Sequence, residues 1–600
     1  MNFTYKLSKR LAIIKSVLVL SLGVSVFACQ TDNNTGSSVP HITQLVMVPE
    51  SVSVDASQTY QLKVYGRTAA GDSVGSDVHA VAWSTSDPAV ATVSARGLVS
   101  SLTEGAVTVS ATSDGASAAA KVRVRTPIPH AGWHVSPDGN SSGTGTPSQP
   151  WSMTYALSGA AGRIQPGDTV WVHGGIYHGK FTATVSGATG RPVVIRQFPG
   201  ERAMIDVAGY TSTTSRGDAF IVRGAWTEWW DFEIMSSDPV RDTDLRPNMI
   251  VNNASNTKYI DLIVHDGGIG FYNYPSAANV EVNGSIFYNN GWQRSKGGGH
   301  AMYLKSATGP VIIRDNVAFN QYGYGIHVYT DAGAGQLVNI TLDGNVAFNN
   351  SSVTLQYNTT SNANILVGGE EPVSASKVLN NMTYFSPGYG VYNVMAGYGS
   401  LGNVDITMTN NYFVGGSNVL TMGQWSQVTA TGNQLFGSSR VVQMKDTTLS
   451  GYVWAANNYT RDPLASAWQY KGTDYSFLNW QLNTGLGLTD LVTSGTPVTP
   501  QIFVRPSTHE PGRAVVVVYN WGRGPSVNVD LAGVLPAGQQ YEVRNVQNWF
   551  GTPVTTGTFG GGSITIPMDG VAPPTPVGGF PHVPPRTGPD FDVFVVRPMK

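Results

Sequence analysis

The side chains best suited to chemistry gather on two short alternating runs in the middle of the chain. One run carries Tyr303 and Lys305, the other carries His327 and Tyr329, and one residue separates the members of each pair. Alternation of period two is typical of a β-strand, in which residues i and i+2 point to the same face. Phenol, amine and imidazole groups can donate, hold or accept a proton beside a bound substrate. We therefore predict one acid–base cluster formed by these four side chains.

Other side chains border the predicted cluster. His300 and Tyr324 stand just before the two runs, whereas Tyr272 and Tyr392 take outward positions in other runs of the same kind. Many glycines lie around them. Because glycine has no side chain, the surface beside these residues stays flat enough to hold a polymer chain. We predict that these four residues and Glu371 contact the substrate.

Carboxylates form a second constellation just beyond the runs. Asp331 follows Tyr329 by two residues, and Glu370 follows Gly368 by two residues in the next run. If both keep the register of their runs, their carboxyl groups lie about 5 Å apart, the separation of a retaining glycosidase pair. Such acids can also be solvated turn residues, or ligands of Ca²⁺, which takes about six to eight oxygen atoms. Ca²⁺ is the one cofactor that the sequence leaves open, although no EF-hand or Asp-x-Asp spacing supports it.

A repeat that extends from about Gly268 to Phe436 must position these groups. Its six copies start roughly 24 to 39 residues apart, within the range of solenoid repeats. An Asn-x-x-aromatic tag recurs in most copies: Asn316 to Phe319, Asn345 to Phe348, Asn381 to Tyr384, Asn410 to Phe413 and Asn433 to Phe436. One coil cannot cover its own apolar face, so successive coils stack and share a core. The pattern predicts a parallel β-helix, with asparagines at a fixed turn bonded from coil to coil.

The alternation also sorts inward from outward positions. The residues that open the runs are predicted to stack inward: Ile269, Met302, Ile326, Ile365, Val391 and Val419. The next position points outward and carries Gly270, Tyr303, His327, Leu366 and Tyr392. Because adjacent coils lie about 4.8 Å apart, the acid–base cluster should form a compact square on the outer surface. Arg314 aligns with Asp343 on the next coil, which predicts a lateral salt bridge.

The N-terminal segment has the features of a secretory signal. Basic residues precede a short apolar stretch from Ser16 to Phe27, which is shorter than the about 20 residues that span a bilayer. The only cysteine, Cys29, follows at the expected cleavage point and resembles that of a bacterial lipobox. This resemblance implies that residues 1–29 are a lipoprotein signal, that Cys29 is lipidated and that residues 30–41 are a tether. It also implies an envelope location, on either face of an outer membrane.

Residues 42–126 read as a separate β-sandwich. Alternating runs with turn signals about every ten residues favour short antiparallel strands. Val81 to Pro88, Ala91 to Val93 and Gly97 to Val99 resemble the bacterial immunoglobulin-like domain type 2. Such a domain is expected to act as a spacer.

The central segment resembles a known superfamily. Trp133 to Gly139, Pro166 to Val172 and Gly174 to Tyr177 are similar to the N-terminal entry of the pectate-lyase-like right-handed parallel β-helix superfamily, with a capping helix expected at Ser152 to Leu157. This places a β-helix at residues 130–498. Strand candidates after Pro500 predict a C-terminal β-sandwich at residues 499–600. The expected fold is all-β.

The amino-acid composition indicates which kinds of binding partner the protein is suited to. Charged residues make up 12% of the chain and the net charge is −2, so nothing indicates nucleic acid or a basic membrane patch. The chain contains 14 Trp and 26 Tyr, which suits contact with sugar rings. We expect a monomer that acts on a polysaccharide.

The leading functional expectation is a lyase that cleaves a uronic-acid polysaccharide by β-elimination. His327 or Lys305 would be the base, Tyr303 or Tyr329 the acid, and His300 or Lys305 the group that neutralises the sugar carboxylate. Lys305-Ser306 and Gly368-Gly369-Glu370 resemble elements of β-helical alginate and chondroitin lyases, although in the reverse order along the chain.

Two alternatives remain open from the sequence. A glycoside hydrolase would use Asp331 and Glu370, with Asp266 as a further candidate. A non-catalytic rod would use the same surface only to hold glycan, since a fold alone does not choose a reaction.

Overall fold

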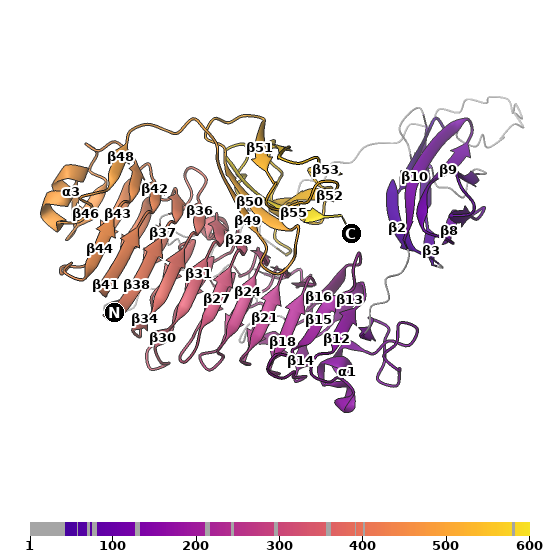
Figure 1. Ribbon diagram of the computed structural model, residues 1–600, viewed down its shortest axis with the longest axis horizontal. Helices are drawn as coiled ribbons and strands as arrows, with labels where there is room; N and C mark the ends of the chain where they lie inside the picture. The colour runs from indigo at the N-terminus through magenta and orange to yellow at the C-terminus, as the bar shows by residue number, and fades with distance from the viewer. Residues whose placement is uncertain are drawn as a thin grey trace, which may run out of the picture. The chain divides into compact units, whose positions relative to one another are not determined.

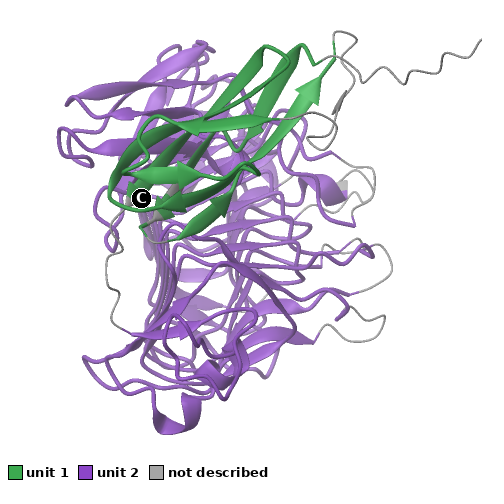
Figure 2. Cartoon of the chain, turned by 90° about the vertical axis from the view of Figure 1, so that its right-hand side faces the viewer, with its two compact units in different colours: residues 1–130 green, residues 131–600 purple. Residues whose placement is uncertain are grey.

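The chain forms two compact units, residues 1–130 and 131–600 (Figure 2). This computed structural model describes residues 42–56, 58–68, 73–74, 81–125, 132–210, 217–241, 245–292, 298–355, 362–390, 392–399, 402–578 and 583–599. The predicted signal, tether and lipidation site at Cys29 lie outside the described residues, as does Val391. Among the described residues, no helix has the length and apolar character needed to cross a membrane.

The first unit is a sandwich of short strands. Its sheets are ordered β1-β4-β5, β2-β10-β9-β6 and β3-β8-β7. The strands are β1 (Gln44–Val48), β2 (Ser51–Asp55), β3 (Thr59–Gln61), β4 (Lys63–Arg67), β5 (Ser73–Val74), β6 (Ala82–Thr85), β7 (Ala91–Val93), β8 (Leu98–Ser101), β9 (Gly105–Ser113) and β10 (Ala116–Arg125). Val107, Val109 and Ala111 alternate along β9 and are buried in the core. The Ig-like prediction is confirmed.

The second unit is built on a parallel β-helix of three sheets, each with twelve strands (Figure 1). The chain visits the first, second and third sheet in turn and then begins the next coil. The first sheet contains β11 (Trp133–Val135), β12 (Thr169–Val172), β15 (Val193–Gln197), β18 (Thr227–Trp230), β21 (Thr257–Ile260), β24 (Val280–Asn283), β27 (Val311–Arg314), β31 (Ile340–Asp343), β35 (Ser376–Leu379), β38 (Asn403–Thr409), β41 (Trp425–Thr431) and β44 (Tyr452–Ala455).

The second and third sheets follow the same order along the rod. The second contains β13 (Gly175–His178), β16 (Ala203–Asp206), β19 (Glu233–Met235), β22 (Ile263–His265), β25 (Ile286–Tyr288), β28 (Val317–Phe319), β32 (Val346–Phe348), β36 (Met382–Tyr384), β39 (Tyr412–Val414), β42 (Gln434–Phe436), β45 (Asn458–Thr460) and β48 (Leu491–Thr493). The third contains β14 (Phe181–Ala183), β17 (Asp218–Val222), β20 (Asn248–Asn252), β23 (Phe271–Asn273), β26 (Met302–Leu304), β29 (Ile326–Val328), β33 (Ile365–Val367), β37 (Tyr392–Ala396), β40 (Asn418–Met422), β43 (Arg440–Met444), β46 (Trp468–Tyr470) and β47 (Thr473–Tyr475). Only β46 and β47 pair antiparallel within these three sheets as described.

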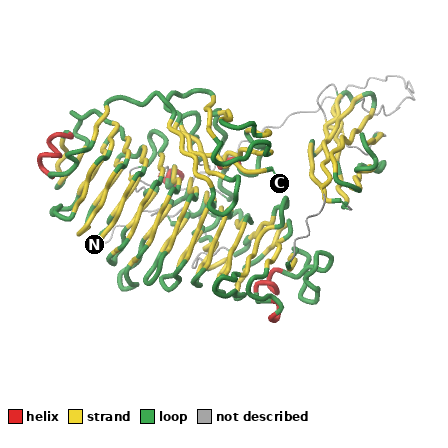
Figure 3. Tube along the Cα trace, in the orientation of Figure 1, coloured by secondary structure: helices red, strands yellow, loops and turns green. Residues whose placement is uncertain are grey.

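Both ends of the rod are covered by short helices. Helix α1 (Met153–Leu157) buries Met153, Ala156 and Leu157 against the first coils, as the sequence predicted. Helix α3 (Phe477–Thr484) buries Phe477 and Trp480 at the other end, next to Trp468 (Figure 3). Covering the end coils removes strand edges that would otherwise pair with other chains. A minor sheet, β30 (Leu337–Val338) with β34 (Val373–Ser374), and the turns η1 (Ala160–Gly162) and α2 (Ser352–Leu355) lie in the loops.

A ladder of buried asparagines fixes the corner between the first and second sheets. Each side-chain amide donates to the carboxamide oxygen of the next, at 3.0, 3.0, 3.1, 2.8 and 2.9 Å along Asn316, Asn345, Asn381, Asn411, Asn433 and Asn457. The predicted tag at Asn410 is wrong by one residue. Asn410 holds the left-handed turn with φ of 56°, and Asn411 joins the ladder.

The C-terminal strands form a sandwich that lies on the second sheet. A five-stranded sheet ordered β49-β50-β55-β52-β53 faces a pair, β51-β54. The elements are β49 (Gln501–Pro506), β50 (Ala514–Tyr519), β51 (Ser526–Asp530), β52 (Gln540–Asn545), η2 (Val546–Asn548), β53 (Thr555–Thr558), β54 (Ser563–Pro567) and β55 (Phe591–Pro598). Val516 and Val518 face the strand pair, whereas Val515 and Val517 pack on apolar residues of the β-helix. The all-β prediction with a sandwich at each end is confirmed.

The register corrects part of the predicted alignment. Phe271, not Ile269, pairs with Met302, so Tyr272 and not Gly270 shares the outward row of Tyr303. Val394 pairs with Ile365, which places Tyr392 at the start of its strand rather than in that row. A loop of variable length precedes each of these strands, so the runs cannot be aligned from their first apolar residue.

Candidate functional site

The candidate site lies on the outer face of the third sheet, at β23, β26 and β29. Tyr272, Tyr303 and His327 occupy directly paired positions on these three strands. The register continues past the strand ends, because Lys305 N donates to Asn273 O at 3.2 Å and Tyr329 N donates to Leu304 O at 3.4 Å. Alternation therefore brings Lys305 and Tyr329 to the same face as Tyr303 and His327.

His327 lies inside a group of aromatic rings. Its ring centroid is 4.2 Å from that of Tyr324, 4.9 Å from Tyr329 and 5.1 Å from Tyr303, all stacked. His300 approaches edge-on at 4.5 Å, and its Nδ1 accepts a hydrogen bond from Tyr324 N at 3.1 Å. The sequence predicted a cluster on the surface, but the rings bury His327 to 7% exposure.

Burial sets the protonation state of His327. Loss of hydration, followed by the nearby positive charges of His300 and Lys305, holds the pKa of His327 well below its ordinary value. Its Nδ1 is buried and has no hydrogen-bond partner among the described residues. The ring is thus neutral near pH 7, which is the form that accepts a proton.

Lys305 and Asp331 form an ion pair at the edge of the aromatic group. Lys305 Nζ lies 3.1 Å from Asp331 Oδ2 and 5.2 Å from the ring centroid of Tyr303. The Lys305 side chain is 9% exposed, whereas that of Asp331 is 66% exposed. A buried ammonium group thus lies beside the tyrosine, with an exposed carboxylate as its counter-ion.

The two tyrosines of the cluster keep their protons. Burial, then the nearby Asp331 carboxylate, raises the pKa of Tyr303 well above its ordinary value. The pKa of Tyr329 is raised as well, first by burial and then by Glu370, to which it hydrogen bonds. Both phenols therefore offer a hydrogen rather than a negative charge near pH 7.

The predicted carboxylates lie on consecutive coils. Glu370 N donates to Thr330 O at 2.9 Å, so the register reaches the positions of Asp331 and Glu370. Both residues are exposed, and each contacts one member of the acid–base cluster: Asp331 pairs with Lys305, and Glu370 bonds Tyr329. Glu371 accepts a hydrogen bond from Gly333 N and closes the turn after Asp331.

Two tyrosines extend the aromatic surface toward later coils. Tyr392, like Tyr324 and Tyr329, packs against a buried group formed by Ala363, Leu366 and Met395. Tyr398, which the sequence reasoning missed, meets Tyr329 edge-on at 5.5 Å and is 37% exposed. In the coil register Tyr398 aligns with Gly369 and Thr330, so no aromatic residue recurs at its position in the two preceding coils.

Asp266 lies in a different network. Its carboxylate bonds His265 Nδ1 at 2.7 Å and pairs with Arg241, while His265 Nε2 bonds Glu233 at 2.9 Å. All four side chains are buried. The structure therefore places Asp266 among charges that hold the second sheet, apart from the predicted acid–base cluster.

One group of carboxyl oxygens has the spacing of a metal site. Ligand atoms of Asp231, Asp261 and Glu510 lie within 4.8 Å of one another. All three acids already have an arginine partner: Arg196 pairs with Asp231 at 3.1 Å, and Arg513 pairs with Asp261 at 3.0 Å and with Glu510 at 3.9 Å. Burial raises the pKa of Asp261 well above its usual range, which favours its protonated form. We assign no metal to this group.

Comparison with known proteins finds two regions of the chain that match family models. Residues 133–426 match the family described as Pel9A-like, right handed beta helix region, and residues 41–124 match the bacterial Ig-like domain (group 2). The chain thus carries a Pel9A-like right-handed β-helix behind an N-terminal Ig-like domain. A comparison with curated proteins gives no match.

Several solved structures match parts of the chain at low identity. Pectate lyase Pel9A is 15% identical, with 55% of this chain and 80% of that protein covered and a TM-score of 0.40. An alginate lyase from Paenibacillus sp. str. FPU-7 is 17% identical, with 53% and 97% covered and a TM-score of 0.35. XylC in complex with xylose is 11% identical, with 64% and 89% covered and a TM-score of 0.40. At these identities the likeness concerns the fold alone.

Proposed function

We propose that this protein cleaves a uronic-acid-containing polysaccharide by β-elimination at the surface of β26 and β29. The observation that carries the proposal is the convergence of a neutral imidazole, an ammonium group and two protonated phenols on one outward face. Such a lyase must remove the proton at C5, neutralise the neighbouring carboxylate and protonate the leaving oxygen.

His327 is assigned as the base. The C5–H electrons form the C4–C5 double bond, the C4–O bond breaks and the leaving oxygen takes a proton. A neutral imidazole is ready to accept the C5 proton, and a substrate carboxylate bound nearby would favour the charged product form. Without substrate the rings around His327 hold it uncharged.

Lys305 and Tyr303 take the other two roles. Lys305 Nζ neutralises the uronate carboxylate, which replaces Asp331 as its partner. Tyr303 donates its hydroxyl proton to the leaving oxygen, with Tyr329 as the competing donor one coil away. His300, Tyr324, Tyr272 and Tyr392 present polar edges and ring faces that suit sugar units, and Glu371 shapes the adjoining turn.

The test is a panel of acidic and neutral polysaccharides, read both by ultraviolet absorbance of the unsaturated product and by new reducing ends. Wild-type protein should generate both signals on an acidic polymer. His327→Ala should lower turnover by at least about 100-fold. If His327→Ala keeps its activity, Lys305 becomes the candidate base.

The pH profile separates the two bases. Because the pKa of His327 is held below its ordinary value of about 6.5, the acidic limb of kcat/KM should lie below that pH. A profile that rises only under alkaline conditions would instead indicate Lys305.

A hydrolase is the second candidate, since Asp331 and Glu370 follow paired strands on consecutive coils. Hydrolysis would produce reducing ends without the ultraviolet signal. Glu370→Gln should then abolish activity, whereas the proposed lyase should tolerate this change within about tenfold.

We further propose a monomer held in the bacterial cell envelope through lipidated Cys29. The Ig-like domain supports a location outside the cytoplasm. Metabolic labelling with a fatty acid, compared with a Cys29→Ser variant, tests the anchor.

A further inference from the structure

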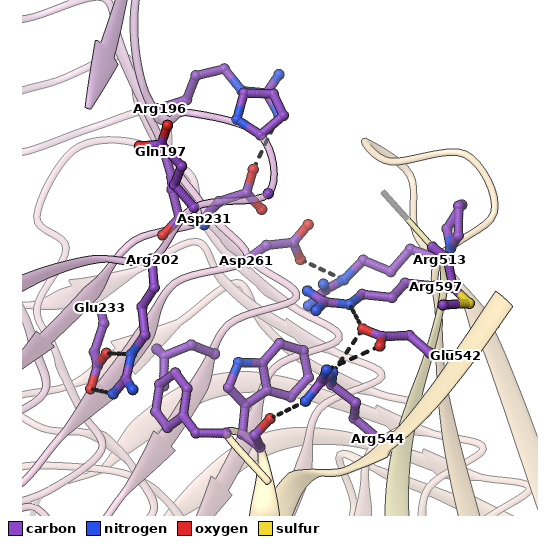
Figure 4. Close-up of a pocket in the computed structure, with 18 residues that line it drawn as sticks. Arg196, Gln197, Arg202, Asp231, Glu233, Asp261, Arg513, Glu542, Arg544 and Arg597 are labelled. Carbon is purple, nitrogen blue, oxygen red and sulfur yellow. Dashed lines mark hydrogen bonds and ion pairs between the residues drawn. The ribbon is translucent and has the colours of Figure 1, made fainter. Parts of the chain in front are cut away.

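A second concave site lies where the β-helix meets the C-terminal sandwich. The cavity has a volume of about 390 Å³, within the usual range for small-molecule sites. Arg196 and Arg202 reach it from the β-helix, and Arg513, Arg544 and Arg597 reach it from the sandwich (Figure 4). The cavity therefore exists only while the sandwich is docked.

The cavity is lined by equal numbers of arginines and acidic residues, but the arginines are more exposed than their acidic partners. Three arginine side chains are exposed, Arg202 by 54% and Arg196 and Arg597 by 28% each. Their carboxylate partners are withdrawn, with Glu233, Asp231 and Glu542 exposed by 2%, 13% and 10%. Glu201 is the more exposed acid, and it already bonds His173 and Gly174 N. The surface that a ligand meets is thus dominated by guanidinium donors.

Some N–H groups of these arginines can still donate hydrogen bonds to a ligand. Nε of Arg597 bonds Glu542, which also has a bidentate partner in Arg544. Arg196 bonds Asp231 through Nη2, which leaves other N–H groups of its guanidinium as donors. The carboxylates of the cavity already accept hydrogen bonds from these arginines. A ligand that binds the remaining N–H groups must therefore bring its own oxygen acceptors.

Aromatic rings complete the lining. Phe550 is 40% exposed, and the Arg202 guanidinium lies 3.6 Å from its ring centroid. Trp549 lies 5.1 Å from Arg597 and 5.7 Å from Arg513. A flat ring beside forked donors suits a sugar ring that carries a carboxylate.

We propose that this cavity is a second binding site for a carboxylated sugar unit of an acidic polysaccharide, which rests on the proposed function. The site is separate from the acid–base cluster. Its β-helix residues come from the corner between the first and second sheets, whereas the cluster lies on the third sheet. The protein would hold one stretch of polymer here while another occupies the catalytic face.

The test measures binding, not cleavage. Calorimetric titrations use hexamers of galacturonate and of mannuronate, with a neutral galactose hexamer for comparison, on full-length protein carrying His327→Ala. Arg597→Gln leaves Glu542 with Arg544, and Phe550→Ala removes the exposed ring. Each variant should lower the affinity of the second site for an acidic hexamer by about tenfold or more.

Arg314→Gln is the matched control. Arg314 is 32% exposed and shares Asp343 with Arg505, so its loss also leaves the acid with a second arginine. This variant should bind like its parent. Unchanged affinity in Arg597→Gln and Phe550→Ala, or equal binding of the neutral hexamer, would overturn the proposal. If no polysaccharide is cleaved but both variants lose acidic-hexamer binding, this site stands and the lyase assignment falls.

Discussion

At the scale of single residues, the candidate site depends on aromatic rings that change the properties of neighbouring polar groups. His327 alone would be a solvated histidine on a strand. Stacked between Tyr303, Tyr324 and Tyr329, it becomes a buried neutral base. The same rings make the hydroxyl group of Tyr303 a proton donor that does not ionise near pH 7.

The role of that hydroxyl is testable by removing one oxygen atom. Tyr303→Phe keeps the ring that packs on His327, so the fold should be unaffected. Turnover should fall by about 10²- to 10⁴-fold, because the leaving oxygen loses its acid. Steady-state kinetics on the polymer measure this change.

Tyr274→Phe serves as the comparison, since Tyr274 is exposed and its ring meets that of Tyr272 edge-on at 4.9 Å. Its turnover should match wild type. Full activity in Tyr303→Phe, combined with loss in Tyr329→Phe, would move the acid to Tyr329.

At the scale of elements, hydrogen bonds between coils keep the strands in register. Asn381 accepts hydrogen bonds from the backbone and side-chain amides of Asn345, at 3.0 Å each, and donates to Leu342 O and Asn411. A slip of one residue would turn His327 and Tyr303 into the core. The ladder therefore supports the site although it lies at another corner of each coil.

Cutting the ladder should cost stability. Asn381→Ala leaves buried donors of Asn345 without an acceptor, and we expect the free energy of unfolding to fall by about 3 kcal/mol. Urea unfolding measures this change. Asn479→Ala, on the exposed face of α3, should stay within about 0.5 kcal/mol of wild type. Equal stability of the two variants would mean that the ladder is not a stabilising element.

At the scale of the whole molecule, the three outer faces of the β-helix have different chemistry. The first sheet shows charged pairs such as Lys258 and Glu228, 3.0 Å apart. The second shows apolar residues that the C-terminal sheet covers, among them Phe319 and Phe348. The third keeps its polar and aromatic face for the candidate site. Because the sandwich packs on the second sheet, it does not cover the candidate site on the third sheet.

A buried charge network joins the C-terminal chain to the rod. Asp266 accepts a hydrogen bond from Val577 N at 2.8 Å and bonds His265, which also bonds Glu233. Burial alone would lower the pKa of His265, but its bonds to Asp266 and Glu233 raise it above its ordinary value. The protonated ring is therefore favoured by folding.

This raised pKa predicts a pH-dependent stability. The contribution is complete below the unfolded value of about pH 6.5 and is lost as the pH rises through the folded pKa. Wild-type protein should lose unfolding free energy as the pH rises above about 6.5 and through the raised folded pKa of His265, and His265→Gln should lack this part of the slope. His178→Gln, at an exposed histidine, should keep it. An unchanged slope in His265→Gln would assign the effect to other groups.

Local patterns in the sequence predicted most elements well. Period-two alternation predicted the two strands that carry Tyr303 and His327, which are β26 and β29 in the structure, and the aligned charges of Arg314 and Asp343 form the predicted lateral pair at 3.3 Å. Side-chain alternation and turn chemistry act over a few residues, so both can be read without a tertiary structure. The same reasoning misplaced Tyr392 and the row of Tyr272, because register depends on loops whose lengths vary between coils.

The sequence by itself determined that the chain is a stacked β-helix between two sandwiches, and that Tyr303, Lys305, His327 and Tyr329 meet on one face. Only the tertiary structure decided that His327 is enclosed by rings, that Asp266 belongs to another network and that a guanidinium-lined cavity forms beside Arg597. The physical reason is the distance along the chain over which each property is determined. Alternation is a local property of each strand, whereas burial, charge pairing and the shape of a cavity depend on residues hundreds of positions apart that meet only after folding.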